Sequence, residues 1–267
     1  MLELRLAALG ALRIKDPAEK VEATRALADS AHAIDPAIEF TSPADIPGRP
    51  ERPMLVRPGE VAQRSVATPE GRAALVHALA HIEFNAINLA LDIVWRFARM
   101  PEDFYREWTH VAVEEAGHFL LLRERLAELG LTYGEFPAHD GLWEMAERTG
   151  GDLIARLALV PRTLEARGLD ASPAVRAKFA SVGDAKSAQV VDRILRDEIG
   201  HVAAGNRWFR YACSCAGLDP ITAHEAAILA YRAPRLRGPF NVDARRAAGF
   251  NAEEIQALSN GSHAGPP

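Results

Sequence analysis

Cysteine is scarce in this sequence of 267 residues, which holds only Cys213 and Cys215. Residues two positions apart on a helix point about 200° away from each other, so an easy disulfide between them is excluded. We therefore expect two reduced cysteines that serve as small packing residues. The sequence also has no Cys-x-x-Cys pair, which small iron-binding domains commonly use.

Several other signals are missing. No apolar run approaches 18 residues, and the first residues lack the basic-then-apolar pattern of a signal peptide. We therefore expect a cytoplasmic protein without a membrane segment. Nucleophile elbows, phosphate loops and dinucleotide-binding glycine patterns are absent as well, so redox chemistry would need an external electron donor. A net charge of −5 argues against a general nucleic-acid surface.

What the sequence does contain is a series of punctuated helices, and no segment alternates like a strand. Caps, first-turn prolines and glycine stops predict helices at about 3–12, 17–33, 69–100, 102–130, 142–148, 152–168, 184–216 and 220–233. A short helix after Ser172-Pro173 and a last one capped by Asn251 complete the prediction. The predicted fold is all-α. We predict N-terminal helices and a proline-rich crossing (1–67), a four-helix bundle (68–216), a helical extension (217–260) and a disordered tail (261–267).

One short pattern occurs twice on the predicted bundle helices, as Glu115-Ala-Gly-His118 and Glu198-Ile-Gly-His201. A lone glutamate precedes each copy at nearly the same distance, because Glu83 lies 32 positions before Glu115 and Glu165 lies 33 positions before Glu198. Residues three apart on a helix are separated by about 60° around the axis and ~4.5 Å along it, so one metal ion can touch both. Four carboxylates and two imidazoles in this order are the donor set of a di-iron or di-manganese site in a four-helix bundle.

The surroundings of these residues strengthen this interpretation. Each ionisable group interrupts an otherwise apolar helical stripe. Burying four unpaired carboxylates would cost more than the net stability of a domain, so positive charge is needed among them. Two divalent ions would balance the four glutamates. By contrast, Glu107-Trp-Thr-His110 repeats the same spacing on a mostly polar face, and we interpret it as a surface pair.

On these residues the chain resembles the ferritin-like di-iron carboxylate superfamily. The resemblance covers about residues 68–216, and Glu-Glu-x-x-His at 114–118 and Asp-Glu-x-x-His at 197–201 carry it. With the flank Leu-Arg-Gly-Pro-Phe-Asn at 236–241, the chain looks most like a bacterial ferritin-like family known only as a domain of unknown function. The resemblance implies a ferritin-like bundle that holds two iron ions, with manganese or a mixed Fe/Mn pair as alternatives and zinc as a substitute in a crystal. The implied ligands are Glu83, Glu115, His118, Glu165, Glu198 and His201.

Other polar residues near these motifs have more than one interpretation. We hypothesise that Asp197 accepts a hydrogen bond from His118, and that Glu114 or a carbonyl does so for His201, because ligand histidines usually donate their free ring N–H. The alternative is that both acids are solvated. His77 and His81 could hold zinc together, but hydrogen-bonded core histidines are the commoner case. Pro161, four residues before Glu165, predicts a kink in the third bundle helix.

The first functional interpretation is a di-iron oxidoreductase that uses O₂ or peroxide, such as a hydroxylase or monooxygenase. Oxidising both irons would add two positive charges, which an oxygen-derived anion can balance. Phe84, Ile87 and Phe119 are candidates for the wall of a substrate pocket. The alternatives are an iron-handling or peroxide-detoxifying protein, and a structural or partner-binding helical protein. The expected partners are a small-molecule or oxygen substrate and an electron donor. A tRNA substrate and a homodimer stay open.

Overall fold

The protein is all-helical in a computed structural model that describes residues 3–29 and 32–263. Within these residues no strand occurs, and the β-type pairing is limited to two isolated bridges, Glu3 with Ala33 and Leu55 with Ala138. The all-α prediction is therefore confirmed. The last helix reaches His263, into the segment expected to be disordered, and the rest of that tail lies outside the described residues. Part of the predicted end of the 17–33 helix also lies outside them.

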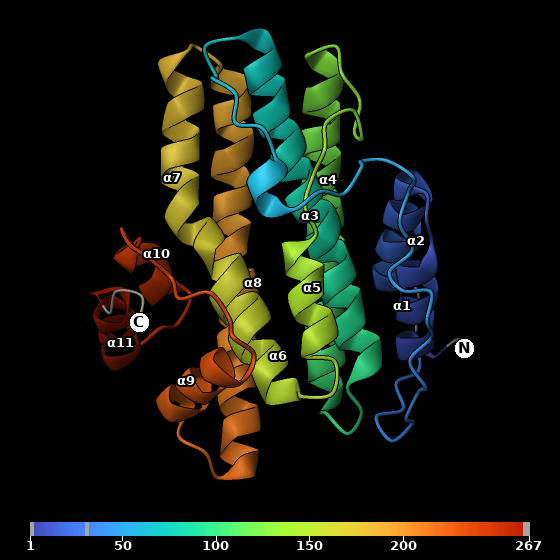
Figure 1. Cartoon of the computed structure of the whole chain (residues 1–267). Coiled ribbons are helices and arrows are strands. Elements are labelled where there is room, and N and C mark those ends of the chain that lie inside the picture. Colours follow the sequence, from blue (N-terminus) through green and yellow to red (C-terminus); the bar gives the residue numbers. More distant parts are fainter. Residues whose placement is uncertain (1–2, 30–31, 264–267) are drawn as a thin grey trace. The chain divides into compact units, whose positions relative to one another are not determined.

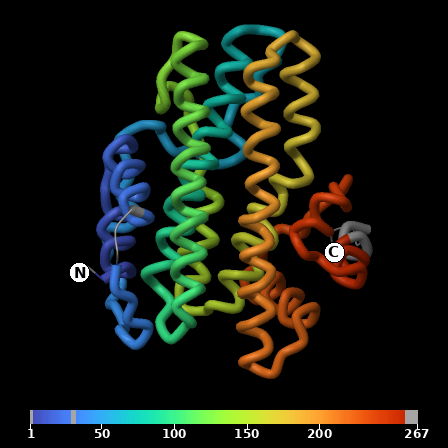
Figure 2. Tube along the Cα trace, turned by 180° about the vertical axis from the view of Figure 1, so that it is seen from behind, coloured from blue at the N-terminus to red at the C-terminus, as the bar shows by residue number. Residues whose placement is uncertain are grey.

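The chain divides into two compact units, Met1–Trp143 and Glu144–Pro267. Unit 1 contains α1 (Leu4–Arg13), α2 (Pro17–Asp29), the 3₁₀ turn η1 (Pro58–Glu60), α3 (Pro69–Arg96) and α4 (Glu102–Glu128), and α5 (Gly141–Arg148) spans the boundary. The long helices α3 and α4 lie antiparallel and side by side, with α1 and α2 packed along them (Figures 1 and 2). The Thr68 side chain caps α3 by accepting from Gly71 N at 3.0 Å, as the sequence predicts. The domain limits predicted at 67, 216 and 260 stay predictions.

Two buried cations hold the proline-rich crossing onto unit 1. Arg5 donates to the carbonyls of Asp35 at 3.1 Å, Ile38 at 2.6 Å and Trp95 at 3.0 Å, so it ties the crossing to the end of α3. Lys20 donates to the carbonyls of Leu12 and Gly48 and to the Asn88 side chain. Burial, with a smaller effect of Arg49, lowers the pKa of Lys20 to about 7. These contacts attach the crossing to α1, α2 and α3 within unit 1.

Unit 2 contains α6 (Leu153–Leu159), a π-helical turn η2 (Val160–Glu165), α7 (Ala166–Ser181), α8 (Ala185–Ala216), α9 (Pro220–Ala230), α10 (Val242–Ala247) and α11 (Ala252–His263). The chain runs from α6 through η2 into α7, which packs beside α8 (Figure 1). The predicted stop near residue 168 and the separate helix after Ser172 are wrong, because α7 continues through Pro173. Leu169 and Phe179 are both fully buried on either side of this exposed proline, so packing holds the helix in register. Helix α10 was not predicted.

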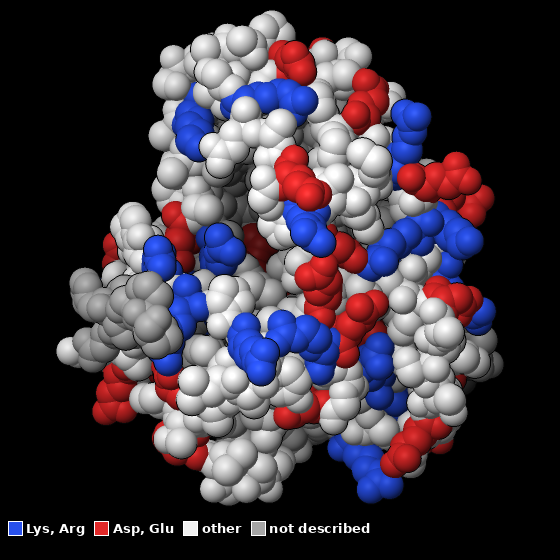
Figure 3. Space-filling model, in the orientation of Figure 1, with Lys and Arg blue, Asp and Glu red and all other residues white. Residues whose placement is uncertain are grey.

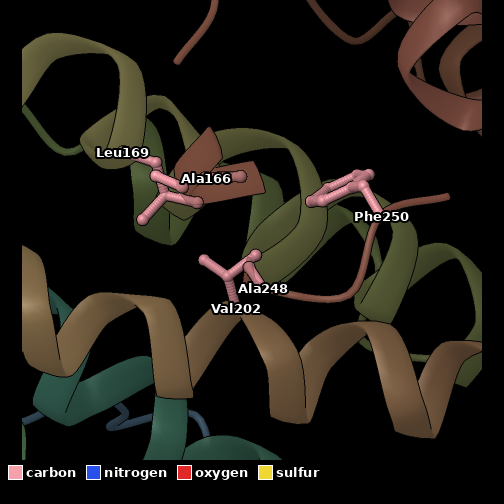
Figure 4. Packing of buried hydrophobic residues seen from close by; sticks show 6 residues of the cluster. Ala166, Leu169, Val202, Ala248 and Phe250 are labelled. Atoms are coloured by element: carbon pink, nitrogen blue, oxygen red, sulfur yellow. The ribbon is translucent and has the colours of Figure 1, made fainter. Parts of the chain in front are cut away.

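A small apolar cluster attaches the C-terminal segment to α7 and α8. Figure 4 shows Ala166 and Leu169 of α7 facing Val202 of α8, with Ala248 and Phe250 arriving from the turn after α10. Asn251 then caps α11 by accepting from Glu254 N at 2.8 Å, as predicted. The C-terminal extension is therefore part of the core of unit 2.

The described residues include one helix, α3, that is long and apolar enough to cross a membrane by length and composition. In its most apolar stretch, 72% is buried inside the protein. This burial is typical of the core helix of a soluble protein. On the molecular surface, acidic and basic side chains are interspersed over the face shown in Figure 3.

Candidate metal centre

Unit 1 brings three of the six predicted ligands together at the contact of α3 and α4. Glu83 on α3 is 4% exposed, and Glu115 and His118 on α4 are each 2% exposed. The Nδ1 atom of His118 lies 3.3 Å from Glu115 Oε2 and 3.4 Å from Glu83 Oε2. The antiparallel packing of α3 and α4 therefore gives one imidazole nitrogen two carboxylate neighbours, one from each helix. We call Glu83, Glu115 and His118 the first half-site.

The electrostatics of the first half-site favour a positive charge. Burial by itself lowers the pKa of His118, because it disfavours the charged ring. The hydrogen bonds and negative charges of Glu115 and Glu83 outweigh burial and raise this pKa to about 11. A cation is therefore stabilised between the two carboxylates, whether a proton or a metal ion carries the charge.

Unit 2 contributes an equivalent pair on α8. His201 is 1% exposed and Glu198 is 8% exposed, and His201 Nδ1 lies 3.7 Å from Glu198 Oε1. In both copies of the motif it is therefore Nδ1 that faces the glutamate three residues earlier. Glu165 is half-buried and stands at the last position of η2, where the chain enters α7. We call Glu165, Glu198 and His201 the second half-site.

The π-helical turn gives a structural account of the predicted kink at Pro161. Proline has no N–H to donate to the carbonyl four residues earlier. The helix adopts the wider π form here, in which hydrogen bonds join residues five apart instead of four. Thr163 Oγ1 donates to the carbonyl of Ala158 at 2.7 Å, five residues back, and Ala166 N donates to the carbonyl of Pro161. The sequence predicted a kink here but not its type, since a proline can equally end a helix.

The other Glu-x-x-His pair is different in its surroundings. The His110 side chain is 71% exposed, and its Nε2 atom lies 3.5 Å from Glu114 Oε1. Glu107 is half-buried. The interpretation of His110 as a surface residue is confirmed, and burial separates this pair from Glu115 with His118.

His77 and His81 anchor a loop. His77 Nε2 accepts from Gly134 N at 2.9 Å, and His81 Nδ1 lies 2.8 Å from the hydroxyl of Tyr133. Burial lowers the pKa of both rings to about 4, so both are neutral at pH 7. These partners favour hydrogen-bonded core histidines, the commoner case, over a zinc site. Tyr133, which the sequence did not single out, also packs against Phe84 and Phe119, with ring centroids 5.7 and 5.0 Å away.

The two second-sphere candidates are partly exposed. Asp197 is 32% exposed in its side chain and has Arg193 Nε at 3.9 Å from its Oδ2. Glu114 is 35% exposed and lies beside His110. Their assignment to the ligand histidines stays a prediction.

The four motif residues are all buried. Glu115, His118, Glu198 and His201 make a buried set of two carboxylates and two imidazoles that could bind metal ions. Oxygen and imidazole donors of this kind suit iron, manganese and zinc. An all-helical chain with these buried donors is a candidate metal-binding protein.

The comparisons with known proteins give the family. Residues 13–256 match the family described as "Protein of unknown function (DUF455)", and the chain belongs to this family. It is also similar to a protein of Haemophilus influenzae described as "Uncharacterized protein", with 44% identity over 261 residues, which cover 92% of this chain and 90% of that protein. No solved structure matches the chain.

Proposed function

We propose that the two half-sites face each other in a ferritin-like four-helix bundle and hold two iron ions between them. The four bundle elements would be α3, α4, the segment from α6 through α7, and α8. The observation that carries this proposal is the equivalence of the half-sites. Each places a buried histidine Nδ1 atom beside the glutamate three residues earlier, at 3.3 Å in one half and 3.7 Å in the other.

The charge of the ligand set supports two divalent ions. Glu83, Glu115 and Glu198 are at most 8% exposed, and buried negative charge needs positive charge nearby to balance it. Together with Glu165 they bring four negative charges, which two divalent cations neutralise. Metal-ligating histidines are neutral, so His118 and His201 add donors without changing this balance.

We propose that the bound metal supplies oxygen or peroxide chemistry, and that the protein is an oxidoreductase of the hydroxylase or monooxygenase type. The residues of this chain would fix the coordination of the metal and keep bulk water away from it. Phe84 follows Glu83 and Phe119 follows His118 in the sequence, and the rings of Phe84, Phe119 and Tyr133 pack against one another. Iron storage without substrate oxidation is the competing function.

Iron and oxygen together test this proposal. Protein purified without chelator and loaded anaerobically with Fe(II) is expected to bind two ions per chain, measured by inductively coupled plasma mass spectrometry. Exposure to O₂ should then produce new near-ultraviolet absorbance in a stopped-flow experiment. An iron-loaded protein whose spectrum does not respond to oxygen would rule out the oxidoreductase. Mineral growth beyond two irons per chain would favour storage.

Asp197→Asn tests whether the acid next to Glu198 supports a ligand histidine. The substitution keeps the size of the side chain and removes its charge. If Asp197 supports a ligand histidine, the variant should bind metal about 10–100-fold more weakly than the wild type. The matched control is Asp192→Asn on the same helix, whose carboxylate pairs with Arg176 at 2.9 Å. Equal affinities in the two variants, measured by competition with a chromophoric chelator, would show that Asp197 is only a solvated acid.

A further inference from the structure

Unit 2 has a pocket that the proposed metal chemistry does not use. It lies among η2, α9, α11 and the segment that follows α9. Its lining includes the apolar side chains of Ile221, Ile228, Leu236 and Leu258, together with Arg162 of η2. The pocket has an empty volume of about 560 Å³, which includes open solvent. This volume suits a small organic ligand.

Arg162 is a buried cation with spare donors. It is 3% exposed, and its Nη2 atom lies 2.7 Å from Glu254 Oε1. Its Nε and Nη1 atoms are buried and have no hydrogen-bond acceptor. The guanidinium carbon lies over the rings of Phe209 and Phe250, 4.7 and 5.0 Å from their centroids. Buried guanidinium donors normally find acceptors, so two unused nitrogens at a pocket wall point to a missing acceptor.

Neighbouring acceptors are already engaged. Glu254 also accepts from Arg210 Nη2 at 2.6 Å and from Asn251 N at 2.9 Å. The Thr163 hydroxyl donates to the carbonyl of Ala158, and its oxygen faces His224 Nε2 at 2.9 Å. Burial, followed by the charge of Arg162, lowers the pKa of His224 to about 4, so this ring is neutral at pH 7.

The charges of the lining residues balance, but the donors of Arg162 are not all used. Two arginines meet two carboxylates, because Glu254 Oε1 lies 2.7 Å from Arg162 Nη2 and Glu225 Oε2 lies 3.5 Å from Arg235 Nη2. The unused donors of Arg162 therefore belong to a pocket that also has apolar lining residues. That combination fits a ligand with an anionic head and an apolar tail.

We propose that this pocket binds a short, unbranched organic acid, whose carboxylate accepts from Arg162 and whose alkyl chain lies against Ile221, Ile228 and Leu236. A carboxylate supplies the acceptor that the buried guanidinium lacks. The assignment is independent of the metal centre and of its chemistry.

Hexanoate is the probe, with acetate, hexanol and chloride as comparisons, titrated into the full-length protein by isothermal titration calorimetry. Hexanoate is expected to bind at least about tenfold more tightly than acetate, because its longer chain buries more apolar surface. Hexanol should bind at least about tenfold more weakly than hexanoate, because it has no charge for Arg162.

Two tryptophan variants on α9 provide the matched test. Ile228→Trp fills the pocket and is expected to weaken hexanoate binding by about tenfold or more, whereas Leu229→Trp, at a side chain that is 68% exposed, should leave it unchanged. Both keep the pair of Arg162 with Glu254. Arg162→Gln should abolish the preference for hexanoate over hexanol, and circular dichroism checks its fold.

Four results would overturn the assignment. Hexanoate that does not bind, or binds equally to the Ile228→Trp variant, excludes this pocket as the site. Hexanol that binds as tightly as hexanoate removes the role of the cation. Chloride that displaces hexanoate at equal concentration would make this a site for inorganic anions only.

Discussion

Replacing Glu115 and His118 together by alanine is expected to lower the metal content from two ions per chain to one or fewer. The double substitution removes one carboxylate and one imidazole from the first half-site and leaves only Glu83. Losing two donors should weaken binding there by at least about 100-fold, since losing only an outer-sphere partner costs 10–100-fold. Metal content is measured after gel filtration by inductively coupled plasma mass spectrometry.

The chain carries its own control for this experiment. Glu107→Ala with His110→Ala removes the same residue types at the same spacing from the same helix, but at an exposed histidine. This control variant should retain both ions. Equal metal loss in the two variants would mean that α4 was damaged as a whole, and the first half-site would lose its assignment.

The mirrored variant, Glu198→Ala with His201→Ala, tests whether the two half-sites share their ions. If glutamates bridge both metals, either double variant should release most of both ions. If the half-sites bind separately, each variant should lose one ion and keep the other.

Removing the metal with a chelator should lower the melting temperature of the wild type, because a ligand that binds only the folded state stabilises it. If chelator leaves the melting temperature of the wild type unchanged, the result would favour the alternative of a structural or partner-binding helical protein.

The buried positions of the motif residues could be predicted because their signals are local. A buried helical stripe repeats every three or four residues, so the apolar residues before and after Glu115 and His118 predict that both are buried. The same logic separated His110, which proved exposed. Caps at Thr68 and Asn251 were also predictable, since a capping side chain bonds within its own turn.

Features that depend on residues far apart in sequence could not be predicted. Arg162 is buried because Phe209, Phe250 and Glu254 surround it, and these partners lie 47–92 positions away. No local sequence pattern predicts that an arginine is buried with N–H groups that lack acceptors. Pro173 misled the prediction because tertiary packing, which buries Leu169 and Phe179 on either side of the proline, keeps α7 continuous.

Gly205 on α8 is a second long-range feature, since it permits the close approach of η2. A Cβ atom at this position would lie 2.7 Å from Pro161 Cβ and 3.0 Å from Pro161 Cγ. The proline ring is rigid, so it cannot turn away as the end of a long side chain could. Pro161 stands four residues before Glu165 in the same π-helical turn. A residue larger than glycine must therefore push η2 away from α8 and move Glu165 with it.

Gly205→Ala is expected to destabilise the protein by about 1–3 kcal/mol, the usual cost of overpacking a core. The matched control is Gly200→Ala on the same helix, where an added Cβ meets nothing within 4 Å. This control should gain about 0.5–1 kcal/mol from helix propensity. Urea unfolding of the two variants measures the difference, and metal content shows whether Glu165 has moved. If both variants are stabilised alike, Pro161 does not confine α8, and if Gly205→Ala loses stability but keeps both ions, Glu165 is not a ligand.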